Sequence, residues 1–441
     1  MWGGGKFLTQ NKVLAGFYYR FLSASKDSIP VSDRGNCAIG LELDWGEDGK
    51  IVTVENAEFH RNAKVIFGYN YDEAELYPVR EIFKNAVTLY YYRLNGGGAK
   101  ATGKWGTAKY TGTRGNAIKV VVANAIDEVG KFDVETYLAN AKVDAQRVTT
   151  MAELKDNAFV VWAKDATLEA DAGTTFTGGT NGTVNGEAHQ AFLDKAERVF
   201  FHALGCNSND LVTLELYKSY TKRMCDEIGK VFQLVAPATD SAGKAWDADN
   251  YSVITVQNKV LDNGKPEYAL VYWALGAHAG VAINKTLQNS VYNGELTIDT
   301  DYTQTQLENF IANGKFVFHE AGEKVRVLAD INSFVTLTEE EQSEFKNNRS
   351  VRVYYQQITD IANAFNTNWQ GISPNDADGR SAFRGVIIKY LEELQDKRAI
   401  QEFDPDTVVV EKGDAKGAVT VGYPTNAVDA MYQLYATITV Q

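Results

Sequence analysis

The sequence predicts a multidomain α+β protein. A discontinuous α/β domain is interrupted by a β-rich insertion and followed by a C-terminal α+β domain, with a strand-forming arm at each chain end. Three observations carry this prediction. Short apolar strands alternate with amphipathic helices in residues 21–95 and again in 188–334, as in α/β folds. The stretch between them, 96–187, is rich in Thr and Gly and strand-like. Residues 335–427 carry two long helical stripes and a short hairpin.

The N-terminal arm is predicted at residues 1–20. It begins with Gly3-Gly4-Gly5, which gives the backbone wide conformational freedom. Residues 13–21 are rich in strand-forming side chains but have no evident local partner. We therefore expect an extended segment that pairs elsewhere.

The two halves of the α/β domain share one pattern. Strands are expected at 38–43, 51–54, 65–67, 87–94, 199–204, 231–236, 251–260 and 268–273. Helices are expected at 74–83, 188–196, 214–228 and 275–287, and a hairpin at 315–328 around Ala321-Gly322.

The insertion begins where Asn95-Gly96-Gly97-Gly98 breaks the α/β pattern. Its last part, 171–186, has low hydrophobicity and many turn residues. We expect a loop here, and we expect residues 174–186 to be exposed on the outer surface and to tolerate a short peptide tag, because such tips face solvent.

The C-terminal domain is predicted to start with a helix capped at Thr338, because Thr338 and Glu341 form a capping box. Its apolar stripe runs from Val351 to Phe365, and a second stripe runs from Phe383 to Leu394. Strands are expected at 407–411 and 419–423.

The last segment, 428–441, alternates apolar and polar residues up to the final position. Its apolar members are Tyr432, Leu434, Ala436, Ile438 and Val440. A strand of this kind is about twice the usual length, and an unpaired edge is an aggregation hazard. Two interpretations stay open: the strand pairs inside its own domain, or it adds to the sheet of a neighbour.

Composition excludes several function classes. The net charge of −13 argues against general nucleic-acid binding, which favours basic faces. The longest apolar run, 268–283, is too short to span a membrane and contains His278. The three cysteines show no metal-ligand spacing, and no signal peptide is evident, so we expect synthesis in the cytoplasm.

The sequence offers little chemistry, and we expect no catalytic, cofactor-binding or metal-binding residues. The five histidines are scattered, and no HExxH, GxSxG, Walker A or GxGxxG pattern occurs. Ser208 lies near His202 and Asp210, which could suggest a hydrolase, but three such residues often occur this close together by chance. The small residues of Gly276-x-His278-x-Gly280 indicate close helix packing rather than a phosphate loop. Asn375–Gly379 lacks the glutamate of an EF-hand, so a loop capped by Asx turns explains it better.

An ordered set of residues resembles one family over nearly the whole chain. The C-terminal set comprises Arg352, Gln356-x-Ile358-x-Asp360-Ile361, Trp369-Gln370-Gly371, Asn375, Gly379-Arg380, Tyr390-Leu391, Ala399-Ile400 and Leu434-Tyr435-Ala436-Thr437-Ile438-Thr439-Val440. The N-terminal set comprises Gly3-Gly4-Gly5-Lys6-Phe7-Leu8-Thr9-Gln10-Asn11-Lys12-Val13, Ser32-Asp33-Arg34-Gly35 and Leu41-Glu42-Leu43-Asp44-Trp45-Gly46. Together they resemble contractile phage tail sheath proteins, in the branch found in Gram-positive prophages and phage-tail-like bacteriocins. One departure is Ala15-Gly16, where relatives usually have Pro-Gly.

The resemblance implies a structural protein, with a β-sandwich in the insertion. Subunits of this family form hexameric discs that stack helically around an inner tube. The C-terminal domain touches the tube, and both arms donate strands to neighbours. The implied partners are further copies of the chain, the inner tail tube protein, and baseplate and tail terminator proteins, with no cofactor, nucleic acid or direct membrane insertion. We therefore expect the protein to be incorporated into a phage tail or tail-like particle.

The resemblance also nominates site residues. Candidates for inter-subunit strand exchange are Val13, Phe17, Tyr19, Tyr432, Leu434, Ala436, Ile438 and Val440. Candidates for facing the tube are Arg380, Arg384, Lys389 and Lys397, basic residues on the helix expected at 378–400 of an acidic protein. A solvated helix face is the alternative that stays open for them. The predicted domain limits are 1–20 and 428–441 for the arms, 21–95 with 188–334 for the α/β domain, 96–187 for the insertion and 335–427 for the C-terminal domain.

Two other function classes stay open. One is an α/β hydrolase-like enzyme with a β-rich accessory module, although its triad or metal site is missing from the sequence. The other is a surface adhesin or carbohydrate-binding protein, which should be exported.

Overall fold

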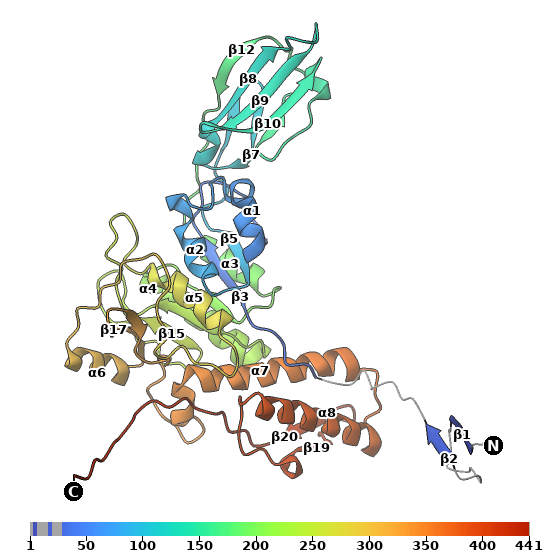
Figure 1. The fold of residues 1–441 in the computed structure, drawn as a ribbon, viewed down its shortest axis with the longest axis vertical. Coiled ribbons are helices and arrows are strands. Elements are labelled where there is room, and N and C mark those ends of the chain that lie inside the picture. Colours follow the sequence, from blue (N-terminus) through green and yellow to red (C-terminus); the bar gives the residue numbers. More distant parts are fainter. Residues whose placement is uncertain (1–2, 7–15, 20–28, 441) are drawn as a thin grey trace. The chain divides into compact units, whose positions relative to one another are not determined.

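The computed structural model describes residues 3–6, 16–19 and 29–440. The chain divides into two compact units. The large unit comprises Asp33–Tyr355 and Asp429–Gln441, and the small unit comprises Met1–Ser32 and Gln356–Val428. The division falls within one helix, α7 (Asn348–Ala364). Figure 1 gives the element labels used below.

The large unit contains a seven-stranded sheet in the order β16-β15-β14-β13-β3-β5-β4. All neighbours in it are parallel except β4 and β5. The strands are β3 (Asn36–Leu41), β4 (Ile51–Glu55), β5 (Thr88–Arg93), β13 (Ala203–Gly205), β14 (Gln233–Pro237), β15 (Val253–Val256) and β16 (Lys315–Phe316). Strands from before and after the insertion share this sheet, which confirms the discontinuous α/β domain.

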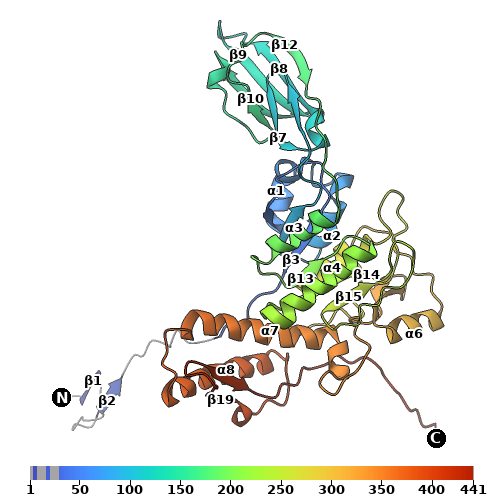
Figure 2. The same cartoon turned by 180° about the vertical axis from the view of Figure 1, so that it is seen from behind.

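Helices cover both faces of the sheet, as parallel sheets require. One face is covered by α1 (Asn56–Phe67), α2 (Tyr77–Phe83) and α5 (Leu270–Gly280), whose side chains form one core with Cys37, Ile39 and Val235. The other is covered by α3 (Gly186–Ala196) and α4 (Leu211–Lys222), which pack on Ala38, Leu204 and Leu234. Figure 1 shows α5 in front, and Figure 2, seen from behind, shows α3 and α4.

Shorter elements complete this domain. The 3₁₀ turn η1 (Ala74–Leu76) precedes α2, and the π-helical turn η4 (Arg223–Ile228) extends α4. Beyond them lie α6 (Gln304–Ala312), the hairpin β17 (Phe318–Glu320) and β18 (Val325–Val327), and the 3₁₀ turn η5 (Ser343–Lys346). The hairpin turns at Ala321-Gly322 as predicted, but it is shorter than expected, because Lys315 and Phe316 belong to β16 of the central sheet.

Two strand predictions in this domain are wrong. Residues 65–67 end α1, and 270–273 begin α5 instead of forming a strand. Every residue of α5 from Leu270 to Ala279 is buried. A helix that is apolar all round has no polar face, so hydrophobic periodicity cannot distinguish it from a buried strand.

The insertion is a β-sandwich. One sheet has the order β10-β9-β8-β12 and the other β11-β7-β6. The strands are β6 (Lys100–Gly103), β7 (Gly106–Thr111), β8 (Ile118–Asn124), β9 (Phe132–Leu138), β10 (Ala141–Val148), β11 (Val160–Trp162) and β12 (Asp171–Thr175), with 3₁₀ turns η2 (Thr113–Ala117) and η3 (Met151–Glu153). Trp105, Phe159 and Phe176 are buried between the sheets.

The segment 171–186 is only partly the loop that was expected. Its first residues form β12, which pairs with β8, and Phe176 is fully buried. Asn181 donates to Asp44 Oδ1 at 2.7 Å and accepts from Arg93 Nη2 at 3.2 Å. The polar residues of this segment therefore join the sandwich to the α/β domain, and an inserted tag is expected to disrupt that junction.

The small unit contains the second part of α7, which continues as the π-helical turn η6 (Phe365–Trp369), and α8 (Ala377–Asp396). The 3₁₀ turn η7 (Pro405–Thr407) leads to an antiparallel hairpin of β19 (Val409–Lys412) and β20 (Val419–Gly422). Tyr390 on α8 donates to Asp360 Oδ2 on α7 at 2.9 Å. This contact lies between the two predicted apolar stripes.

The predicted start of the first C-terminal helix is wrong. Thr338 Oγ1 does accept from the backbone N–H of Glu341 at 2.9 Å, as in a capping box. That bond closes only a turn, because the helix begins ten residues later at Asn348. A capping pattern alone does not predict where a helix begins, unless apolar residues at helical spacing follow it directly.

Candidate assembly surfaces

The C-terminal segment forms no strand in the single chain: residues 430–440 have no regular secondary structure. Figure 1 shows the segment as a thread that ends at the label C. Tyr432 is 51% exposed, whereas Leu434, Ile438 and Val440 are 90%, 86% and 89% exposed. The predicted strand-forming arm has no partner strand in the described chain, and a strand without a partner cannot pair its backbone groups. The strand-prone, apolar pattern is therefore presented to solvent.

At the N-terminal end, Phe17 and Tyr19 lie in β2 (Gly16–Tyr19), which confirms a strand within 13–21. In the single chain β2 pairs in parallel with β1 (Gly3–Lys6). Val13, the third N-terminal candidate, lies outside the described residues.

The hairpin of β19 and β20 offers free strand edges. It pairs Val410 with Val421 and is a two-stranded sheet, with no third strand among the residues described. Val409 and Val421 are 46% and 37% exposed. Isolated two-stranded hairpins are marginal in water, and added strands stabilise them. The hairpin is thus open to an added strand on either edge.

The nominated basic residues of α8 and its C-cap Lys397 bind mostly to local partners. Arg384 donates to the carbonyl oxygens of Val408 at 2.6 Å and Pro405 at 2.8 Å, and so holds the start of the hairpin. Arg380 donates to the backbone and side-chain oxygens of Asn375. Lys397 pairs with Glu393 at 2.8 Å, whereas Lys389 is exposed. Of the four nominated residues, Lys389 is the best placed for an external partner.

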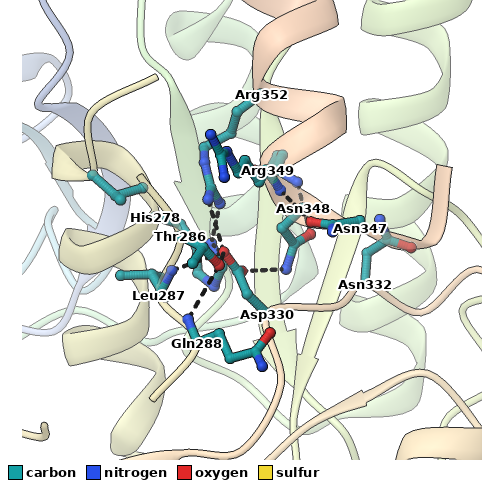
Figure 3. A network of polar contacts seen from close by, with 12 residues as sticks. His278, Thr286, Leu287, Gln288, Asp330, Asn332, Asn347, Asn348, Arg349 and Arg352 are labelled. Atoms are coloured by element: carbon teal, nitrogen blue, oxygen red, sulfur yellow. Dashed lines mark hydrogen bonds and ion pairs between the residues drawn. The ribbon is translucent and has the colours of Figure 1, made fainter. Parts of the chain in front are cut away.

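A buried polar network fixes the first turns of α7 to the large unit (Figure 3). The Asp330 carboxylate accepts from Arg352 Nη2 at 2.7 Å, from Thr286 Oγ1 and the Leu287 backbone at 2.9 Å, and from Asn348 Nδ2 at 3.0 Å. The Arg352 charge and these hydrogen bonds outweigh burial and hold the pKa of Asp330 well below its usual range. His278 on α5 is fully buried beside this pair, and burial lowers its pKa to about 3.

Sequence reasoning found Arg352 but missed its partners. The signal available was the resemblance, which singled out Arg352 and Asp360 without saying what they contact. Asp330 stands in a loop with no periodic pattern, so its role appears only in three dimensions.

The residues suspected of chemistry have structural partners. His202 Nδ1 accepts from the Asn36 backbone at 3.3 Å, and Asp210 caps α4 by accepting from Thr213 at 2.9 Å. Asp376 accepts from the Gly379 backbone at 2.8 Å and is the N-cap of α8, so this acidic loop caps a helix. A Cβ on Gly276 would overlap the carbonyl oxygen of Ile82, which confirms close packing of α5 on α2.

Neither a metal site nor a membrane span is found in the described part of the chain. No cluster of three His, Cys, Asp or Glu residues there could hold a metal ion. No helix there is long and apolar enough to cross a membrane.

Four family models match consecutive parts of the chain. They describe the domain III N-terminal region of tail sheath protein Gp18 (residues 34–94), the phage tail sheath β-sandwich domain (95–181), the phage tail sheath central domain (182–333) and the phage tail sheath C-terminal domain (340–441).

Similar proteins match over nearly their full length. The sheath tail protein of Desulfitobacterium hafniense is 30% identical with a TM-score of 0.81, covering 94% of this chain and 97% of its own. The sheath tail protein of Listeria innocua is 28% identical with a TM-score of 0.77, covering 90% and 93%. The phage-like element PBSX protein XkdK of Bacillus subtilis is 28% identical, with 99% of each chain covered. At 14% identity, the contracted helical sheath of the anti-feeding prophage shares the fold, with a TM-score of 0.57 and coverage of 98% and 99%.

Proposed function

Because this chain belongs to the phage tail sheath protein family and is a contractile tail sheath subunit, we propose that it builds its sheath by donating its terminal arms to neighbouring copies. The observation that carries the proposal is the C-terminal arm. Its alternating side chains are exposed, and its backbone has no partner strand in the described chain. Exposure of Leu434, Ile438 and Val440 is unfavourable, since burying such side chains contributes about 1.5–3 kcal/mol each. A neighbour's sheet edge supplies both the missing hydrogen bonds and the missing burial.

The acceptor in this proposal is the β19–β20 hairpin of another copy. Its edges carry no third strand in the part of the chain that the structure describes, and Val409 and Val421 offer apolar contacts. Phe17 and Tyr19 from the N-terminal arm, with Val13, are proposed to add to the same exchange. Main-chain pairing depends little on sequence, so such links persist while domains move past each other.

The finer partners follow the same proposal. Subunits form hexameric discs around an inner tube, and Lys389 leads the candidate contacts to the tube protein. Baseplate and terminator proteins cap the sheath. Family and fold are those of structural sheath proteins, so the subunit is proposed to have no catalytic activity and to store the energy of contraction in its extended lattice. We also propose that the domains have the limits predicted from the sequence and that the subunit is made in the cytoplasm.

Deletion of 432–441 tests the exchange. The isolated subunit should keep its melting temperature, and sheath seen by electron microscopy should be lost. A matched pair of point variants removes the concern that deletion acts indirectly. Thr437→Pro removes a backbone donor from the arm, and Thr437→Val keeps it and favours a strand. Long sheath formed by the proline variant would contradict the proposal.

A further inference from the structure

The root of the C-terminal arm is held on the end of a helix. Asn347 Nδ2 donates to Asp429 Oδ1 at 2.5 Å. Asn347 immediately precedes α7, and its own Oδ1 accepts from the backbone N–H of Arg349 at 2.9 Å, as an N-cap residue does. One side chain therefore caps the helix and binds the arm.

Charge favours the same contact. Asp429 lies at the positive end of the dipole of α7, where a carboxylate is stabilised. Burial lowers the pKa of Arg349, and the nearby Asp429 carboxylate counteracts that shift. Both the helix and the guanidinium thus attract the carboxylate.

The helix end that holds Asp429 is itself rigidly fixed. The backbone N–H of Asn348 donates to the Asp330 carbonyl at 3.0 Å, and that of Asn332 donates to the Lys346 carbonyl at 3.1 Å. Gln233 on β14 donates to Asn348 Oδ1 at 2.9 Å. Figure 3 shows Asn347 and Asn348 beside the Asp330–Arg352 pair. The anchor point is therefore tied to the central sheet.

Exposure marks where the arm leaves the body. Asp429 and Tyr432 line a pocket of about 250 Å³, with Gln288 and Ile331 among its other walls. Tyr432 is half exposed, and Leu434 is almost fully exposed. The free part of the arm thus starts a few residues after Asp429.

We propose that Asp429 is the positioning residue of the C-terminal arm: held by Asn347, it fixes where and in which direction the arm leaves the subunit. This inference rests on the proposed strand exchange. A fixed root raises the local concentration of the arm near its acceptor, because a segment that starts in one direction samples less space. It also carries load from the arm into α7 when a neighbouring subunit moves.

The test separates positioning from stability. Asp429 is exposed, so Asp429→Ala should leave the melting temperature of the subunit unchanged. It should raise the subunit concentration needed for half-maximal sheath formation about tenfold. Asp429→Asn, whose side-chain oxygen still accepts from Asn347, should recover part of the loss. Asp165→Ala removes another exposed carboxylate and is the matched control.

A distance measurement reads the anchor directly. Spin labels at Met431→Cys and Glu344→Cys, in a Cys225→Ser background, should give a narrow distance distribution in the isolated subunit. Asp429→Ala should broaden it. An equally narrow distribution in Asp429→Ala, or sheath formation equal to that of wild type, would overturn the inference. The proposed exchange itself fails separately, if the 432–441 deletion still forms sheath.

Discussion

The Asp330 carboxylate makes the most sharply quantified prediction. Asp330→Ala removes the acceptor of four hydrogen bonds and leaves the Arg352 guanidinium buried without its counter-charge. Breaking a buried ion pair from one side costs about 3–5 kcal/mol. For a unit of more than 300 residues, whose unfolding entropy is about 0.7 kcal/mol/K, that cost lowers the melting temperature by roughly 4–7 °C.

Differential scanning calorimetry of the isolated subunit checks this value. The double variant Asp330→Leu with Arg352→Met is the control, because apolar replacement of both partners leaves no unpaired charge. We expect it to recover most of the stability lost in Asp330→Ala. An unchanged melting temperature in Asp330→Ala would refute the account of this network.

Three further predictions concern acid, packing and charge. His278 takes up a proton near pH 6.5 in the unfolded chain but only near pH 3 in the folded subunit. The free energy of unfolding should therefore fall as the pH drops from 6.5 to 3. In urea unfolding measured across that range, His278→Phe should reduce this pH dependence. Gly276→Ala should lower the free energy of unfolding by about 3 kcal/mol, because the added Cβ overlaps the backbone of Ile82. Gly385→Ala on α8 places its Cβ in open space and should raise the free energy of unfolding by about 0.5–1 kcal/mol. Equal effects of the two variants in chemical unfolding would contradict the packing account. Arg384→Glu should lower the melting temperature, because Arg384 holds the start of the hairpin. Lys389→Glu should leave the melting temperature unchanged and weaken co-assembly with the tube protein in a salt-dependent way. Unchanged co-assembly at low salt would contradict a contact between Lys389 and the tube.

Elements with a clear amphipathic period were predictable from sequence. The stripe from Phe383 to Leu394 became the buried face of α8, and the strand around Tyr91 became β5. The first half of α5 was predicted as a strand because burial on all sides removes the polar residues that reveal a helical period. A local sequence pattern shows how apolar and polar residues alternate, but it does not show whether the segment is buried on one side or on all sides.

Contacts between residues distant in sequence were beyond local patterns. Asn181 lies in a polar, turn-rich stretch, yet it binds Asp44 and Arg93. Asp429 looks like an ordinary surface residue until Asn347 is seen beside it. The C-terminal arm could be predicted from the sequence, because the alternation of apolar and polar residues up to Val440 is a local pattern.

The central claim is that the C-terminal arm pairs with another subunit. A cryo-electron microscopy reconstruction of the assembled sheath, at a resolution that traces the backbone, tests it most directly. The account predicts residues 432–440 as a strand hydrogen-bonded to the β19–β20 hairpin of a neighbouring copy. An arm that pairs with the hairpin of its own chain, or that stays unpaired in the sheath, would contradict it.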